Sequence, residues 1–377
     1  MTYARARLWL GISGVGAMVV LSLSALLLNL PSRLLGGRPV AVALTMSLGA
    51  YIVISFPFDL FGGYLLPKWQ QLSSQTLVSF LNKWLRAVLW QAGIMAFCGY
   101  AVVQVARVKG PSFSLVCVAV LMIGLLWGQA PIARLIGGLA EVDVDFRSTF
   151  RVLDRLGLKA PAIKAYRSTD QSFVGGLVGC PGRERLIFPA FWLAQFPAEV
   201  CALQIARRAG TVRTGARVRG VIVALLWNLV GFALVAHLSG SDLREPAGFI
   251  TTALWFTFWS FGGLLILPSL SRPAVFEVDR FVKKQGVPDR LLAETMLELD
   301  RLQDDEPVRP PWVERIFHPV PSTSSRLFEL SSDNSPHGAW QCARTALYLS
   351  WACFGFLSRA VHCNSGRPEL WVLFPGD

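Results

Sequence analysis

Histidines, the side chains that most often bind a catalytic metal ion, are scarce in this chain. Only four are present among its 377 residues: His237, His318, His337 and His362. A catalytic zinc site needs about three protein ligands, and helical zinc sites place two histidines four residues apart. No two of these histidines have that spacing, and the adjacent pair His362–Cys363 is too small to be a site by itself. The sequence therefore predicts no histidine-based zinc centre.

The cysteines do not supply a metal site either. The seven cysteines are scattered and include no C-x-x-C pair: Cys98, Cys117, Cys180, Cys201, Cys342, Cys353 and Cys363. Their odd number and irregular spacing argue against a disulfide framework. We interpret them as small apolar residues. One carboxylate, Asp59, ends an apolar run, and at such a terminus we expect it to be solvated or to pair two helices.

The elements that would position any site are membrane helices. The sequence is 53% hydrophobic and only 16% charged, with a mean hydropathy of +0.47, which is typical of membrane proteins. A helical span needs about 20 mainly apolar residues. Six uncharged runs meet this need: 8–30, 40–58, 87–106, 112–133, 220–239 and 247–270. The first is too long for a signal peptide and is interpreted as a retained anchor. The shorter run 345–357 favours an interfacial or buried helix.

The distribution of charge predicts the orientation of these spans. The net charge is +12, and many of the Lys and Arg residues fall in 138–219. Cytoplasmic segments are enriched in Lys and Arg, so we expect this segment and the N-terminus to be cytoplasmic. Arg33, Arg38, Arg107 and Lys109 depart from the rule, because they fall in loops expected outside. A basic surface facing anionic lipid requires no nucleic acid, and none is expected as a partner.

We therefore predict a mainly α fold: a multi-span helical membrane protein with a cytoplasmic helical domain that carries a small β edge. Strands are expected at AIKAYRS and ERLIFP around a glycine-rich turn, as a small hairpin. A helix with one apolar stripe is expected at PDRLLAETMLELDRL. The predicted divisions are a four-span bundle, a first half-domain, a two-span hairpin, a second half-domain and an aromatic-rich tail: 1–137, 138–219, 220–270, 271–341 and 342–377.

The stretch PAEVCALQIARRAG (197–210) has the pattern of a helix. Pro197 suits a first turn, and Glu199 suits the positive end of the helix dipole. An apolar face follows, and then two adjacent arginines. Whether Arg207 and Arg208 bind an anion or only cover a surface is left open by the sequence.

Several stretches, in order, resemble the integral-membrane zinc metallopeptidases of the CAAX prenyl protease type and, more distantly, HtpX. PAEVCALQIARRAG is similar to that family's P-x-E-x-x-A-V-L-A-H-E-L-x-H. SRPAVFEVDRF (271–281) resembles S-R-x-x-E-Y-x-A-D-x-F, and FHPVPSTSSRLFEL (317–330) resembles T-H-P-x-x-x-x-R-I-x-x-L. The stretches 56–86 and 155–193 also resemble family segments. The resemblance covers roughly residues 40–330 and implies a helical barrel around an intramembrane chamber.

The positions that match the family's catalytic residues carry other side chains. The two zinc-binding histidines correspond to Ala206 and Gly210, and the general base between them corresponds to Arg207. The glutamate ligand corresponds to Val275, whereas Asp279 matches the family's aspartate. Arginine cannot act as a base, and a cation there would repel Zn²⁺.

The His-Pro motif can be aligned in two ways. His318 matches the family's histidine, but Arg326 then lies two residues too far along. Counting back from Arg326 instead lands on Val320–Pro321, which removes the histidine. We therefore expect Glu199, Asp279, His318 and Arg326 to be retained motif residues without a metal centre.

These observations predict a catalytically inactive homologue, a pseudopeptidase, that binds or regulates membrane or lipidated proteins or peptides. No cofactor is expected, although the resemblance implies zinc for the family. Two alternatives remain: an active membrane zinc endopeptidase with replaced ligands, and a lipid-handling or transport protein. In each case the protein is expected to be a multi-pass protein of the lipid bilayer.

Overall fold

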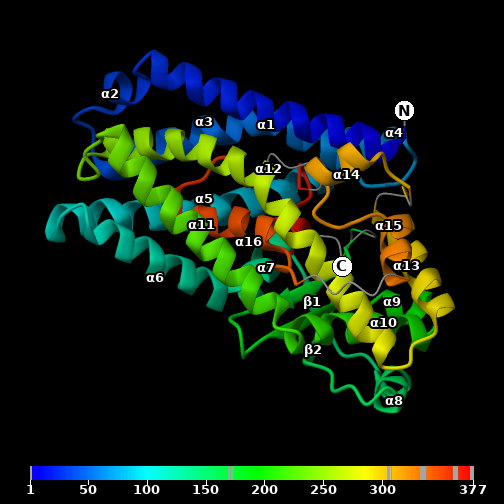
Figure 1. Cartoon of the computed structure of the whole chain (residues 1–377). Helices are drawn as coiled ribbons and strands as arrows, with labels where there is room; N and C mark the ends of the chain where they lie inside the picture. The colour runs from blue at the N-terminus through cyan, green and yellow to red at the C-terminus, as the bar shows by residue number, and fades with distance from the viewer. Residues whose placement is uncertain are drawn as a thin grey trace.

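The computed structural model describes residues 2–168, 170, 173–303, 306, 308–331, 337–359 and 364–373. The long helices lie side by side in a bundle, and the sheet lies at one end of it together with several of the shorter helices (Figure 1). The long helices are α1 (Tyr3–Leu27), α3 (Val40–Leu60), α5 (Leu77–Lys109), α6 (Phe113–Trp127), α11 (Ala216–Ser239) and α12 (Pro246–Lys284). Short helical segments connect them: α2 (Leu30–Leu35), η1 (Phe61–Leu65), α4 (Leu66–Trp69) and α7 (Gln129–Gly137).

Five of the six predicted spans form helices long and apolar enough to cross a membrane. The fourth run, 112–133, is not a straight helix, because α6 and α7 meet at a bend of 68°. Pro131 lies in the first turn of α7. It has no N–H group to donate to the carbonyl of Trp127, and its ring would clash with that carbonyl in a continuous helix. Within the described residues, five helices are therefore long and apolar enough to span, or six elements if the bent pair forms one span.

The small sheet has four strands in the order β1-β2-β4-β3. Their bounds are β1 (Ala140–Val142), β2 (Ala162–Arg167), β3 (Gly176–Val178) and β4 (Arg185–Pro189). The predicted strands are present as β2 and β4, but they pair in parallel, so the expected hairpin between them is wrong. The antiparallel hairpin is β3–β4 instead. The hairpin turns between Val178 and Arg185, where Gly179 (φ +95°) and Gly182 (φ +85°) adopt backbone conformations that favour glycine.

Helices pack around this sheet to form a second layer, which we call the polar layer. Its helices are α8 (Arg147–Arg155), α9 (Trp192–Gln195), α10 (Ala198–Arg213), α13 (Asp289–Gln303), α14 (Pro311–Phe317) and α15 (Thr323–Leu330). Leu292, Met296 and Leu299 of α13 are buried in its core, with Leu291 and Leu302 at the edge, which confirms the predicted apolar stripe. The end of α12 also enters this layer, since that helix continues without a break beyond Leu270.

The C-terminal tail occupies the interior between the long helices. It contains α16 (Cys342–Leu349), η2 (Ser350–Cys353) and η3 (Pro368–Leu370). Helix α16 contacts α6, α11 and α12, and η2 contacts α5 and α6 as well as α11 and α12 (Figure 1). Trp351, Phe354 and Leu357 are completely buried there. The run 345–357 is thus a buried segment between the long helices rather than a span, as the sequence favoured.

Buried polar contacts hold the tail in place. Asp59, in α3, accepts hydrogen bonds from Trp84 Nε1 (2.9 Å) and from the backbone N–H of Gly366 (2.8 Å), and it lies 3.2 Å from Nη1 of Arg359. The guanidinium of Arg359 also lies over the rings of Tyr51 and Trp371. Asp59 is therefore not solvated but pairs helices, the second of the two predicted roles.

Candidate functional site

The helix that resembles the metallopeptidase helix is largely buried in the polar layer. Helix α10 starts after Pro197, with the exposed Glu199 in its first turn. Every residue from 200 to 211 is buried, including both arginines. A buried cation must be paired or extensively hydrogen-bonded. The sequence left open whether Arg207 and Arg208 bind an anion or cover a surface. Their burial indicates a third role, in which they pair with groups inside the protein.

Arg207 is paired with the retained aspartate. Its Nε donates to Oδ1 of Asp279 at 2.9 Å, and its Nη1 lies 3.4 Å from Oε1 of Gln204. Arg326, in α15, approaches the same carboxylate from the other side, with Nε 2.7 Å from Oδ2 and Nη2 2.8 Å from Oδ1. All three ionic side chains are at most 4% exposed. We call Arg207, Asp279 and Arg326 the ion cluster; it joins α10, α12 and α15.

Arg208 supports the sheet rather than the ion cluster. Its guanidinium donates to the backbone carbonyl of Val174 and lies 5.5 Å from the ring centroid of Trp192. Arg217, at the start of α11, donates in the same way to the carbonyl of Gly179 at 3.0 Å. These arginines bind the loop and turn that flank β3, so their role is structural. Sequence reasoning missed this role, because no local pattern links Arg208 to a carbonyl 34 residues away.

The positions that correspond to the family's zinc ligands lie at the contact between α10 and α12. Ala206 is fully buried in the apolar core of the polar layer, and Val275 is buried in a neighbouring apolar cluster. Gly210 faces α12 so closely that an added Cβ would lie 2.8 Å from a ring carbon of Phe281. The structure thus brings α10 and α12 together as the resemblance implied, but apolar groups line their contact at these positions.

Alanine at Gly210 should therefore cost about 1–3 kcal/mol of stability, because the new methyl group would overpack against Phe281. Thermal unfolding of the purified protein in detergent would measure this loss. Gly93→Ala is the matched control, since Gly93 lies in helix α5 with no atom within 4 Å of an added Cβ. Equal melting temperatures for the two variants would contradict the close contact.

Glu277 does not replace the missing glutamate. It lies two residues beyond Val275 on α12, and two residues turn an α-helix by roughly 200°. Its carboxylate instead contacts Nη2 of Arg219 at 2.6 Å, Nδ1 of His337 at 3.0 Å and the N–H of Gly338 at 3.3 Å. This group joins α12 to the start of α11 and to the segment before α16, away from Ala206.

The residues of both alignments of the His-Pro motif line one small cavity. His318 is buried directly after α14, and Arg326 is the residue that reaches Asp279. Both side chains, together with Val320 and Pro321, line a cavity of about 30 Å³. The arginine therefore keeps a contact with the motif aspartate, and the histidine lies beside it.

The described residues do not fit a zinc ion. Among them, no three His, Cys, Asp or Glu side chains lie close enough together to hold a metal. His362 and Cys363 lie outside the described residues. Cys201, the nearest thiol in the α10 sequence, donates weakly to the carbonyl of Trp192 (3.5 Å), and burial raises its pKa to about 12. A thiol must lose its proton to bind zinc, so this environment opposes binding.

The same pKa predicts the reactivity of Cys201. With a pKa raised to about 12, only about one thiol in ten thousand is ionised at pH 8, and the thiolate is the reactive form. Native protein treated with N-ethylmaleimide at pH 8 should leave Cys201 unmodified, with labelling rising only above about pH 11. Peptide mass spectrometry would measure this. The half-buried Cys180 is the internal control and should be modified; equal labelling of both would contradict the environment described for Cys201.

Comparison with solved structures identifies the architecture. The chain matches the crystal structure of Ste24p from S. mikatae with a TM-score of 0.65 and 15% sequence identity, over 80% of this chain and 78% of that chain. This chain has a Ste24-like membrane protease fold. The match agrees with the resemblance found in the sequence, and with the apolar helices it supports an integral membrane protein. At 15% identity the likeness establishes the fold alone. No protein-family model matches the chain, and no curated protein matches its sequence.

Proposed function

We propose that this protein is a pseudopeptidase: a catalytically inactive homologue of the membrane metallopeptidases whose fold it has. Its role is to bind or regulate a membrane or lipidated protein. The observation that carries this proposal is the ion cluster. Arg207 stands at the position of the general base, and it is paired with Asp279, the retained aspartate of the stretch 271–281.

The cluster supports loss of catalysis for a physical reason. A general base must accept a proton, and a guanidinium cannot release one to become such a base. Zn²⁺ beside Arg207 would also meet a like charge in a buried environment, where charges are poorly screened.

Two exposed aromatic side chains support a binding role. Trp312 of α14 is 64% exposed and Phe328 of α15 is 78% exposed, and both lie in the polar layer. Apolar side chains of this size gain free energy when a partner removes them from water. We expect a partner in the same membrane to cover them. We also propose that this layer and the N-terminus face the cytoplasm, in line with the basic residues of 138–219.

Catalysis is tested with the purified protein in liposomes and a prenylated peptide, using Ste24p as the active control. We expect no cleavage above background, with or without a chelator. The variant Arg207→Glu should remain inactive, because it restores the carboxylate but none of the ligands. Chelator-sensitive cleavage by the wild-type protein would overturn the proposal in favour of an active enzyme with replaced ligands.

Partner binding is tested with a photo-crosslinking amino acid at Trp312 or Phe328 in native membranes. A discrete adduct containing a membrane or lipidated protein is expected at both positions. The same probe at Arg290, an exposed position on α13, is the control and should give no adduct. Indistinguishable patterns at all three positions would remove the support that these aromatic residues give to a binding role.

A further inference from the structure

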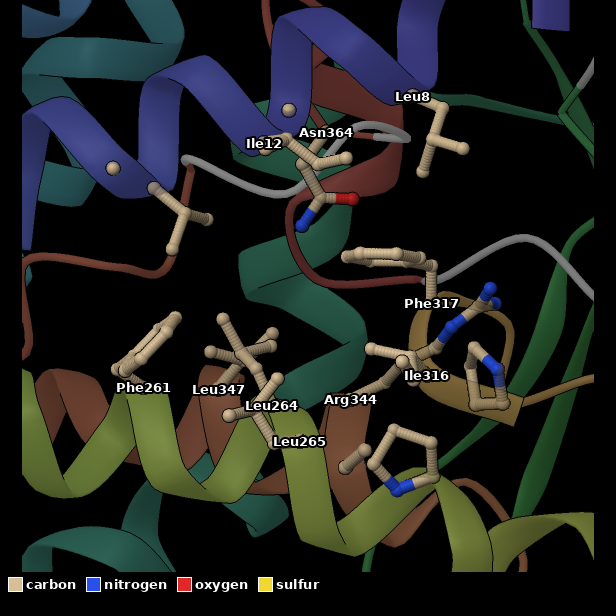
Figure 2. A pocket seen from close by; sticks show the side chains of 16 residues that line it. Leu8, Ile12, Phe261, Leu264, Leu265, Ile316, Phe317, Arg344, Leu347 and Asn364 are labelled. Atoms are coloured by element: carbon tan, nitrogen blue, oxygen red, sulfur yellow. The ribbon is translucent and has the colours of Figure 1, made fainter. Parts of the chain in front are cut away.

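A separate apolar cavity lies between two long helices and the tail. Its volume is about 250 Å³, and it is lined by α1, α12, α14 and the tail (Figure 2). Of the 16 lining residues, only Arg344 and Asn364 are polar. Leu8 and Ile12 lie on the α1 side, opposite Phe261 and Leu264 of α12 (Figure 2). The ion cluster contributes no residue to it, so this cavity is distinct from the candidate site.

The two candidate spans α1 and α12 line the cavity, which puts it at membrane depth when these helices cross a bilayer. Residues 8–16 of α1 and 261–268 of α12 line it, and these are the halves of the two candidate spans nearest the polar layer. The wall also reaches the outer surface of the bundle, since Leu265 is 45% exposed and Phe261 is 36% exposed. In a bilayer that surface faces lipid chains, so hydrocarbon is the material nearest to the opening.

The polar end of the cavity is cationic. Arg344, at the start of α16, lines both this cavity and the 30 Å³ cavity that contains His318 and Arg326. Arg7, in the turn of α1 that precedes Leu8, is buried and donates to the carbonyl of Gln303. The described acids on the elements around the cavity lie beside other cations: Asp300 is 3.4 Å from Arg309, Glu314 of α14 is 2.6 Å from Arg272, and Glu306 is 3.4 Å from Arg5. Among the described residues that line the apolar cavity, Arg344 is the one with a charged side chain, so the polar end of the cavity carries a positive group.

We propose that this cavity binds one acyl chain of an anionic membrane phospholipid, with the phosphate directed toward Arg344. Apolar lining in contact with the bilayer selects the chain, and the cationic end selects the headgroup. A cavity of about 150 Å³ holds the six carbons of benzene, so 250 Å³ accommodates roughly ten carbons of a chain. The inference goes beyond the pseudopeptidase proposal and does not depend on it, because lipid binding requires neither zinc nor a partner protein.

Gly16 provides a clean test of the chain site. It lines the cavity, and nothing lies within 4 Å of an added Cβ, so a phenylalanine there can fill the space without a backbone clash. Gly93→Phe in α5 is the matched control, because Gly93 is equally open and lies outside the cavity. Native mass spectrometry of delipidated protein, titrated with phosphatidylglycerol or with phosphatidylcholine of identical chains, gives the number of bound lipids and their affinity.

We expect one phosphatidylglycerol per wild-type protein, unchanged in Gly93→Phe and weakened at least about ten-fold in Gly16→Phe. Arg344→Gln should remove the preference for phosphatidylglycerol over phosphatidylcholine, and Arg344→Lys should keep it. Equal binding by the two glycine variants, or no preference for the anionic lipid in the wild-type protein, would overturn the proposal. Binding of a myristoylated peptide at this site, without binding of either phospholipid, would also overturn the proposal, because the occupant would then be a lipidated protein.

Discussion

Replacing Asp279 by asparagine should destabilise the protein by about 3–5 kcal/mol, the largest effect that we expect from a single change. Asp279 is the one acidic group between two buried arginines, Arg207 and Arg326. Asparagine keeps the shape of the side chain but removes its charge. Two guanidinium groups would then remain in the core without their shared counter-charge. Chemical unfolding in mixed detergent micelles, followed by tryptophan fluorescence, measures the change in the free energy of unfolding.

Two comparisons separate charge from general damage. Asp154→Asn, at an exposed position of α8, should change stability by less than about 0.5 kcal/mol. The triple variant Arg207→Met, Asp279→Leu and Arg326→Met removes all three charges together and should recover most of the stability, since apolar groups of similar size can replace a buried ion group. If Asp279→Asn were as stable as Asp154→Asn, the ion cluster would not be the structural core of this site.

Asp59→Asn is expected to have the second largest effect, about 3–5 kcal/mol, and to loosen the C-terminal tail. Arg359 would lose the carboxylate that lies 3.2 Å from its Nη1, while its guanidinium remains over the rings of Tyr51 and Trp371. The variant would also weaken the hydrogen bonds that Trp84 and Gly366 donate to the carboxylate. Because these contacts hold the tail to α3 and α5, their loss should raise the population of molecules in which the tail has left the interior.

The readout for tail release is alkylation of Cys353, which is fully buried between the long helices. Its labelling by a membrane-permeant maleimide should be faster in Asp59→Asn than in the wild-type protein. Asp242→Asn, in the exposed loop between α11 and α12, is the control and should leave that rate unchanged. Unaltered labelling together with unaltered stability would contradict the role of Asp59 as the anchor of the tail.

The sequence predicted the membrane helices well, because about 20 consecutive apolar residues are a strong and local signal. It did not predict the bend near Gly128, because the apolar run continues through Pro131. Apolar composition does not reveal that Pro131 lacks the N–H group that a continuous helix would need. The position of the tail was beyond prediction. A run of 13 residues such as 345–357 can be buried in many places, and the pairing of Asp59 with Arg359 joins residues 300 positions apart.

The candidate site was predictable in outline for a different reason. The order of the motifs implied that α10, α12 and α15 meet, and they do meet, at Asp279. The sequence also indicated that Arg207 inverts the charge at its position. It did not indicate that Arg326 shares the same carboxylate, because pairing across 47 residues depends on how the helices pack. The sequence also did not decide between the two alignments of the His-Pro motif. In the structure, His318 of one alignment and Val320 and Pro321 of the other line the same cavity.

The central claim is that the fold of a membrane metallopeptidase is present without its metal centre. The most direct test is the zinc content per protein molecule, measured by elemental analysis on detergent-purified protein that was never exposed to added metal. We predict a ratio near zero, because the ligand positions carry Ala206, Gly210 and Val275 and the position of the base carries Arg207. A ratio near one that a chelator removes would contradict the claim and would require a set of zinc ligands other than these positions.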